Sequence, residues 1–267
     1  MGHVQGKPLI IAHRGASGTV PENTLAAVER ARTLGADGIE VDVQLTRDLI
    51  PVIIHDHTVD RTTDGSGYVS DFSLGEIRRL DAGSWFNQKH PRRASEAFVG
   101  LKLPTLEVVI DLTAETKRRL YLDVKYSEWP AELAWAVYGV VDRKGCWDRV
   151  RFTSSDHFSL GIMKQVKPRG RTAPLFDWRW ATKGTKDILD VARRWQADEL
   201  SLHYTVCTSK LVRTAHEQGL EVVVWSINQR PLMRQFIRCA VDAIITNFPE
   251  RLQEELYGDS LRRSHHD

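Results

Sequence analysis

Two carboxylates, Glu40 and Asp42, stand two positions apart in an otherwise apolar segment, 38–43. In a β-strand alternate side chains point to opposite faces, so both carboxylates share one face and the apolar side chains share the other. Two carboxylates on one buried face repel each other and lose their hydration unless a cation lies between them. A divalent ion with oxygen ligands would resolve this conflict, and a buried ion pair with Arg or Lys is the structural alternative.

A second segment, 120–125, repeats this pattern, because Asp123 and Lys125 fall on one face and apolar residues on the other. Asp123 is a candidate third metal ligand, and Lys125 a candidate contact for a phosphate or another anion. Taken alone, the two residues could equally form an ion pair at a solvated strand end.

Histidine, arginine and tryptophan stand at the ends of other expected strands. His13 and Arg14 follow segment 9–12, His55 ends segment 51–55, and Trp225 lies near the end of segment 221–226. Imidazole exchanges a proton near neutral pH, and a guanidinium binds phosphate through two parallel hydrogen bonds. Two histidines placed around the same carboxylates favour acid–base chemistry on a charged substrate, and Trp225 could form an apolar wall beside it.

Short β-branched segments alternate with helical patterns along the whole chain. Alternation of strand and helix indicates a mainly parallel sheet, and at 267 residues it favours a closed (β/α)8 barrel of the TIM type in one domain. The expected strands are 9–12, 38–43, 51–55, 120–125, 150–154, 172–176, 199–203, 221–226 and 241–246. The expected helices are 24–34, 106–113, 129–143, 186–195, 209–218 and 231–239.

One of these strands is surplus to an eight-stranded barrel. Between segments 38–43 and 51–55 there is no room for the crossover that parallel strands need, so a hairpin turning at Arg47 and Asp48 is expected. Symmetric pairing would place residues whose numbers sum to about 95 opposite each other, and hence Glu40 opposite His55.

Residues 57–104 interrupt the alternation. This segment is expected to be a small insertion after the third strand that roofs the site, with Trp85 and Phe86 as candidate lining residues. The polar tail at about 257–267 is expected to fray.

The composition excludes several classes of protein. The net charge is +2, and no basic stripe indicates nucleic acid. No apolar stretch reaches the roughly 18 residues of a membrane span, and no signal peptide is apparent, so a cytoplasmic protein is expected. Cys146, Cys207 and Cys239 are too far apart for a zinc site and are interpreted as inert thiols. Nothing in the sequence predicts an oligomeric state.

Six short segments follow one another along the chain: AHRG at 12–15, PENT at 21–24, EVD at 40–42, HD at 55–56, DVK at 123–125 and WSIN at 225–228. In this order and spacing they resemble the glycerophosphodiester phosphodiesterase family, from about residue 9 to residue 249. The resemblance implies a (β/α)8 barrel with a small insertion after the HD segment. It also implies roles for eight residues: His13 and His55 as the acid–base pair, Glu40, Asp42 and Asp123 as metal ligands, Arg14 and Lys125 at the phosphate, and Trp225 beside the glycerol.

The chain departs from the family pattern at two positions. The family has Glu where this chain has Asp123, which shortens the reach by about 1.5 Å. A bridging water or a larger ion would compensate. The closing TDxP of the family reads TNFP at 246–249, so Asn247 replaces an acid.

The expected function is metal-dependent hydrolysis of a small glycerophosphodiester to sn-glycerol 3-phosphate and an alcohol, with Mg²⁺ or Ca²⁺ as cofactor. Lysophospholipase D activity would use the same groups on a substrate with an acyl chain. A phosphate-binding barrel without turnover is the non-enzymatic alternative. A glycoside hydrolase could also use paired carboxylates, but it would not need the two histidines, Arg14 and Lys125.

Overall fold

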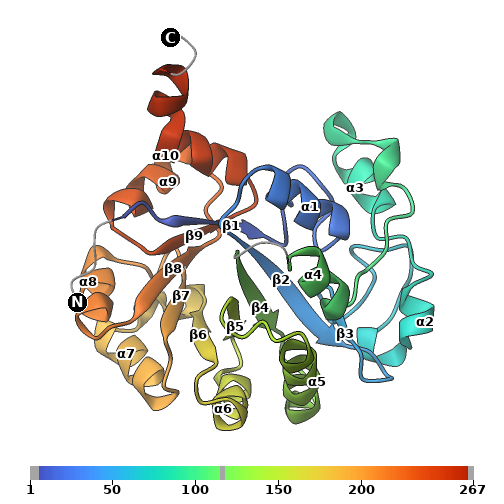
Figure 1. The fold of residues 1–267 in the computed structure, drawn as a ribbon, viewed down its shortest axis with the longest axis horizontal. Helices are drawn as coiled ribbons and strands as arrows, with labels where there is room; N and C mark the ends of the chain where they lie inside the picture. Colours follow the sequence, from blue (N-terminus) through green and yellow to red (C-terminus); the bar gives the residue numbers. More distant parts are fainter. Residues whose placement is uncertain (1–5, 115–117, 264–267) are drawn as a thin grey trace.

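Eight parallel strands close into a barrel in the computed structural model, whose described residues are 6–114 and 118–263 (Figure 1). The first strand pairs with both the second and the last, which closes the ring, so the predicted TIM-type barrel is confirmed. Around the ring the strands are β1 (Leu9–His13), β2 (Gly38–Leu45), β4 (Arg119–Val124), β5 (Val150–Ser154), β6 (Arg171–Phe176), β7 (Glu199–His203), β8 (Glu221–Trp225) and β9 (Ala243–Thr246).

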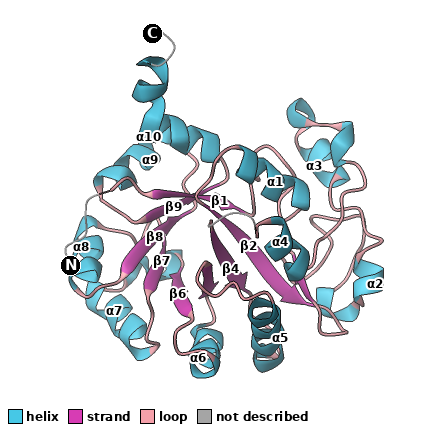
Figure 2. Cartoon of the chain, in the orientation of Figure 1, coloured by secondary structure: helices cyan, strands magenta, loops and turns pink. Residues whose placement is uncertain are grey.

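Helices surround the barrel, as Figure 2 shows. They are α1 (Leu25–Thr33), α4 (Leu106–Leu112), α5 (Pro130–Arg143), α6 (His157–Val166), α7 (Thr185–Arg194), α8 (Ser209–Glu217), α9 (Arg230–Arg238) and α10 (Pro249–Arg263). Their apolar faces pack on the outward side chains of the strands in one large cluster. No helix in the described ranges is long and apolar enough to cross a membrane.

Two of these helices were not predicted. In α6 the sequence carries a glycine, Gly161, which lowers helix propensity. A Cβ there would lie 2.5 Å from the Trp195 ring, so the glycine allows close packing of the helix. In the polar α10, Leu252 and Leu256 are buried against the barrel. The tail predicted at 257–267 therefore begins inside a helix, and residues 264–267 lie outside the described residues.

The ninth strand, β3 (Pro51–Ile53), forms the expected antiparallel hairpin with β2. Its register differs from the prediction, because Val43 pairs with Ile53 and the residue numbers sum to 96. The turn has three residues rather than two, and its last residue, Leu49, has the left-handed φ of 59° that such a turn requires. Pairing ends at Ile53, so Glu40 does not lie opposite His55.

Between β3 and α4 the chain leaves the barrel. This segment contains η1 (Val69–Asp71), α2 (Leu74–Ile77), α3 (Ser84–Lys89), η2 (Pro91–Arg93) and η3 (Glu96–Phe98), and Figure 1 shows α2 and α3 outside the ring of strands. A separate small core holds the segment together, with Val59, Val69 and Ile77 packed on β3 through Val52.

Candidate active site

All eight residues singled out in the sequence line one pocket of about 180 Å³. The barrel explains this convergence, because the carboxyl ends of its parallel strands meet at one face. The residues come from the ends of β1, β2, β4 and β8 and from the segment after β3: His13, Arg14, Glu40, Asp42, His55, Asp123, Lys125 and Trp225.

The three carboxylates form a buried cluster. Carboxylate oxygens of Glu40, Asp42 and Asp123 lie within 4.8 Å of one another, and each residue is buried. Burial and the neighbouring carboxylates raise the pKa of Glu40 well above its usual value. Burial is also the main cause that raises the pKa of Asp123. Raised pKa values mean that Glu40 and Asp123 tend to keep their protons when no cation lies between them. The three carboxylates offer only oxygen ligands, which suit Mg²⁺ or Ca²⁺.

Two basic side chains face this cluster. Lys125 Nζ lies 2.7 Å from Asp42 Oδ1 and 2.5 Å from Asp123 Oδ2. Arg14 donates its backbone N–H to Glu40 Oε2 at 2.9 Å, and its Nε lies 3.1 Å from Asp42 Oδ2. Although burial opposes ionisation, Lys125 and Arg14 hold the pKa of Asp42 below its usual range. Two cations against three carboxylates leave room for further positive charge.

Both histidines are oriented through Nδ1. His13 Nδ1 lies 2.6 Å from Asn247 Oδ1, and His55 Nδ1 lies 2.5 Å from Asp56 Oδ1. Because an oxygen accepts in each case, Nδ1 carries the proton and Nε2 is left as the acceptor. Burial, and then Arg14, lower the pKa of His13 to about 4. Burial also lowers the pKa of His55. Asn247 thus acts as a neutral hydrogen-bond partner where the family pattern has an acid.

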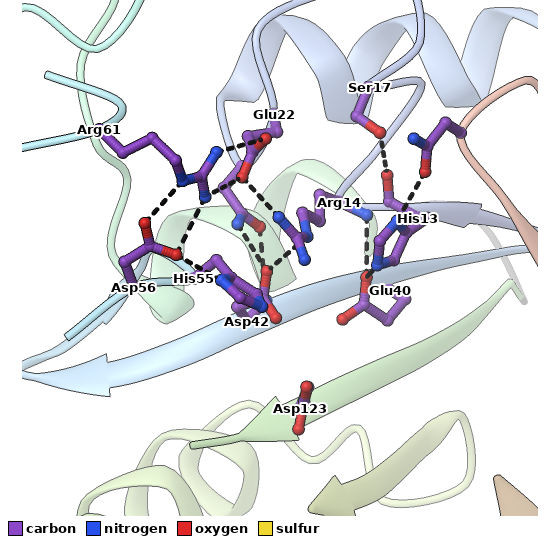
Figure 3. A network of polar contacts seen from close by, with 12 residues as sticks. His13, Arg14, Ser17, Glu22, Glu40, Asp42, His55, Asp56, Arg61 and Asp123 are labelled. Carbon is purple, nitrogen blue, oxygen red and sulfur yellow. Dashed lines mark hydrogen bonds and ion pairs between the residues drawn. The ribbon is translucent and has the colours of Figure 1, made fainter. Parts of the chain in front are cut away.

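A second layer of charged residues links these groups, and the sequence analysis had missed its central member, Arg61 (Figure 3). Arg61 donates to Asp56 Oδ2 at 2.6 Å and to Glu22 Oε1 at 2.8 Å. Glu22 in turn accepts from Arg14 Nη1 at 2.7 Å. The spacing of HD at 55–56 and Arg61 was the only available signal, and a lone arginine in a polar loop does not identify a site residue.

The remaining wall of the pocket comes from β5 to β9, through Thr153, Ser155, Leu175, Asp177, Ser201 and Ile245. No residue of 57–104 is among the lining residues. Phe86 is buried against Phe98 and His90, and Trp85 donates its indole N–H to Ala82 O. The expectation that Trp85 and Phe86 line a roof over the site is therefore wrong.

Comparison with known proteins agrees with this architecture. The glycerophosphoryl diester phosphodiesterase family matches residues 13–251. A glycerophosphodiester phosphodiesterase from Caldanaerobacter subterraneus is 37% identical over 92% of this chain and 96% of its own length. A Silicibacter pomeroyi structure has a TM-score of 0.88 at 26% identity, covering 97% of this chain and 96% of the other. An Oleispira antarctica phosphodiesterase in complex with the product sn-glycerol-3-phosphate has a TM-score of 0.82 at 29% identity, covering 93% and 96%.

A barrel with acidic, basic and imidazole groups at its carboxyl face is typical of a phosphoric diester hydrolase. The chain belongs to the glycerophosphoryl diester phosphodiesterase family. It is accordingly an enzyme of the phosphodiesterase class.

Proposed function

We propose that this enzyme hydrolyses glycerophosphodiesters to sn-glycerol 3-phosphate and an alcohol, with a divalent cation, Mg²⁺ or Ca²⁺, held by Glu40, Asp42 and Asp123. The observation that carries the proposal is the buried carboxylate trio beside two imidazoles and two basic side chains in one pocket. The Oleispira relative, whose structure holds the product sn-glycerol-3-phosphate, supports the choice of substrate.

Substrate binding falls to the basic side chains. Arg14 and Lys125 offer N–H donors to the phosphoryl oxygens and neutralise the charge that develops on phosphorus. A bound divalent cation supplies Lewis-acid polarisation of the phosphoryl oxygens. Trp225 offers an apolar surface against the glycerol carbons, because it lines the same pocket.

The two histidines move the protons. His13, whose pKa of about 4 leaves it neutral, accepts the proton of the attacking hydroxyl or water at Nε2. His55 delivers a proton to the departing alkoxide, because Asp56 at its Nδ1 stabilises the charged imidazolium whereas Asn247 at His13 is uncharged. One proton acceptor and one proton donor are needed whether a substrate hydroxyl or a water molecule attacks the phosphorus.

Metal dependence and the role of Glu40 are tested together. Metal-stripped protein is offered sn-glycero-3-phosphocholine, with Mg²⁺ or Ca²⁺ restored, and glycerol 3-phosphate is measured. Release is expected only with metal and is expected to be lost in Glu40→Gln. Glu107→Gln, on α4 away from the pocket, is the matched control. Release without metal contradicts the proposal, and binding of metal and product without turnover indicates the binding barrel instead.

A further inference from the structure

One residue of the loop after β8, Asn228, has no part in the proposed function, although it lies in the segment WSIN together with Trp225. Trp225 lines the pocket and Asn228 does not. Asn228 instead contacts the loop after β9, and the next strand in the ring is β1, which ends at His13. The loops of three neighbouring strands therefore meet at this side of the pocket.

The side-chain oxygen of Asn228 holds the end of β9. Asn228 Oδ1 accepts the backbone N–H of Asn247 at 2.9 Å and the hydroxyl of Thr246 at 3.3 Å. Thr246 is fully buried, and its Oγ1 accepts the backbone N–H of Phe248 at 3.1 Å. One amide oxygen thus holds Asn247 directly and its two neighbours through the Thr246 hydroxyl.

The backbone carbonyl of Asn247 is held from the other side. It accepts the backbone N–H of Gly18, in the loop after β1, at 2.8 Å. Gly18 packs closely here, because a Cβ at this position would lie 2.3 Å from the Phe248 ring. Both backbone polar groups of Asn247 are therefore bonded, which limits how far the residue can shift relative to β1.

The position of Asn247 matters because its side chain orients the His13 ring. Asn247 Oδ1 lies 2.6 Å from His13 Nδ1 and accepts that proton, which leaves Nε2 as the proton acceptor. The carbonyl of His13 is held separately, by the Ser17 hydroxyl at 2.7 Å (Figure 3). The loop after β1 thus holds the backbone of His13, whereas the orientation of its ring depends on Asn247.

The other histidine has a partner of a different kind. His55 Nδ1 donates to Asp56, a carboxylate, and either oxygen of a carboxylate can accept a proton. Asn247 has one acceptor oxygen and an amino group, and the amino group would donate to Nδ1 if the amide were turned. The proton of His13 would then lie on Nε2. An amide partner therefore has to be held more firmly than a carboxylate partner.

We propose that Asn228 is a positioning residue: by fixing the backbone of Asn247, it keeps the His13 ring in the orientation in which Nε2 accepts the proton of the attacking group. The inference rests on the proposed function, in which His13 has this role. In the part of the chain that the structure describes, no hydrogen bond joins Asn228 to Arg14 or Lys125. Loss of Asn228 is therefore expected to slow the chemical step and to leave substrate binding unchanged.

Kinetics with the soluble diester sn-glycero-3-phosphocholine and a divalent cation test the proposal. In Asn228→Ala, kcat is expected to fall about tenfold, while KM stays within about twofold of the wild type, because the proton acceptor is misplaced and the phosphate contacts remain. Asn228→Asp keeps an acceptor oxygen and is expected to retain most of the kcat. If Asn228→Ala does not fold, Asn228→Gln replaces it, since its amide oxygen is displaced by about 1.5 Å.

Asn87→Ala is the matched control. In the insertion, Asn87 Oδ1 also accepts a backbone N–H at 2.9 Å, that of Ser95, but Asn87 does not line the pocket. Its replacement removes the same kind of hydrogen bond, and kcat is expected to stay unchanged. A loss of kcat equal to that in Asn228→Ala would overturn the inference, because lower stability would then explain both variants.

A double-mutant cycle tests whether Asn228 acts through Asn247. If it does, Asn228→Ala/Asn247→Ala is expected to have the same kcat as Asn247→Ala alone. Additive losses overturn the inference. It is also overturned by an unchanged kcat in Asn228→Ala, by a change in KM alone, or by an Asn228→Asp variant as slow as Asn228→Ala.

Nuclear magnetic resonance tests the position of the ring without turnover. In protein labelled with ¹⁵N-histidine, the His13 Nδ1–H signal is the one that His13→Gln lacks. This signal is expected to broaden or disappear in Asn228→Ala, because a weakened hydrogen bond exposes the proton to exchange, and to persist in Asn87→Ala. If the wild type cleaves no diester, the proposed function fails and this signal alone decides. Its loss in Asn228→Ala supports the positioning role, and its persistence there overturns it.

Discussion

The two ends of the barrel interior both hold buried clusters of charged side chains. Acidic groups are in excess in one cluster, and basic groups are in excess in the other. At the carboxyl ends of the strands, Glu40, Asp42 and Asp123 lie beside two basic side chains, Arg14 and Lys125. At the amino ends, Glu199 and Glu221 face three arginines, Arg119, Arg151 and Arg171. An apolar layer that includes Ile11, Tyr121 and Val223 separates the two clusters. Carboxylates therefore outnumber basic side chains in the first cluster, and arginines outnumber carboxylates in the second.

Hydrogen bonding shows the same difference. Glu199 is fully buried, yet Arg151 Nε donates to its Oε1 at 2.9 Å and the Tyr121 hydroxyl donates to its Oε2 at 2.8 Å. Each buried oxygen of Glu199 thus has a partner within the protein. Burial raises the pKa of both glutamates, but two carboxylates, Asp42 and Asp123, add to the effect at Glu40, whereas only Glu221 does so at Glu199. Glu40 accepts the Arg14 backbone N–H at 2.9 Å. We infer that the charged cluster at the amino end stabilises the fold. The cluster at the carboxyl end lowers the stability of the fold and serves catalysis.

The largest expected effect is on catalysis at the carboxyl end. Glu40→Gln removes the charge of a proposed metal ligand, and kcat/KM for sn-glycero-3-phosphocholine is expected to fall about a thousandfold, or about 4 kcal/mol. In metal-free protein the same change relieves repulsion, so the free energy of unfolding in urea is expected to be equal to or above that of the wild type. A destabilised metal-free variant would mean that this cluster also serves stability.

At the amino end the expected effect is on stability instead. Glu199→Gln leaves the buried guanidinium of Arg151 without its counter-charge, and the free energy of unfolding is expected to drop by about 4 kcal/mol. The kcat of the folded enzyme is expected to be unchanged. Glu221→Gln is the matched control, because Glu221 is more exposed and its loss is expected to cost only about 1 kcal/mol. Equal losses for the two variants, or a lower kcat, would contradict the division of roles.

Protons provide a further test of the carboxyl end. The pKa of His13 is about 4 in the folded protein, against about 6.5 in an unfolded chain. Between these values the unfolded chain binds the proton and the folded chain does not, so the stability contributed by neutral His13 is present above about pH 6.5 and is lost as the pH falls toward 4. In metal-free protein the free energy of unfolding of His13→Gln is expected to fall by about 3 kcal/mol less than that of the wild type as the pH is lowered from about 6.5 to about 4. Urea unfolding at a series of pH values measures this difference. If the free energy of unfolding falls with pH by the same amount in the variant and in the wild type, His13 is not the source of this loss of stability.

Much of the carboxyl end could be predicted because its signal is local. Alternation along β2 places Glu40 and Asp42 on one face whatever the rest of the chain does. The end of β1 then identifies His13, since a parallel barrel brings such ends to one face. The antiparallel hairpin of β2 and β3 returns the chain to the same face at His55. The amino-end cluster has no comparable signal. Alternation gives the face on which Arg151 lies, but not that Glu199, two strands away, meets it inside the barrel.

The errors arise where one local angle or a long-range contact decides the structure. The left-handed Leu49 lengthened the hairpin turn to three residues and shifted the register of β3 by one. The insertion was expected to cover the site through Trp85 and Phe86, but these side chains pack within the insertion itself. What reaches the site from this segment is Arg61, whose two carboxylate partners lie 5 and 39 positions away in the chain.

Arg61 therefore provides the smallest and most specific test of the carboxyl end. Its planar guanidinium contacts Asp56, which orients His55, and Glu22, which holds Arg14, and a lysine cannot make both sets of contacts. Arg61→Lys is expected to lower kcat for the soluble diester about tenfold, or about 1.4 kcal/mol, through a less firmly oriented imidazole. Arg47→Lys is the matched control, since Arg47 pairs with Glu76 outside the pocket and its replacement is expected to leave kcat unchanged. A full kcat in Arg61→Lys would show that the charged groups around the pocket, like those at the amino end, only stabilise the barrel.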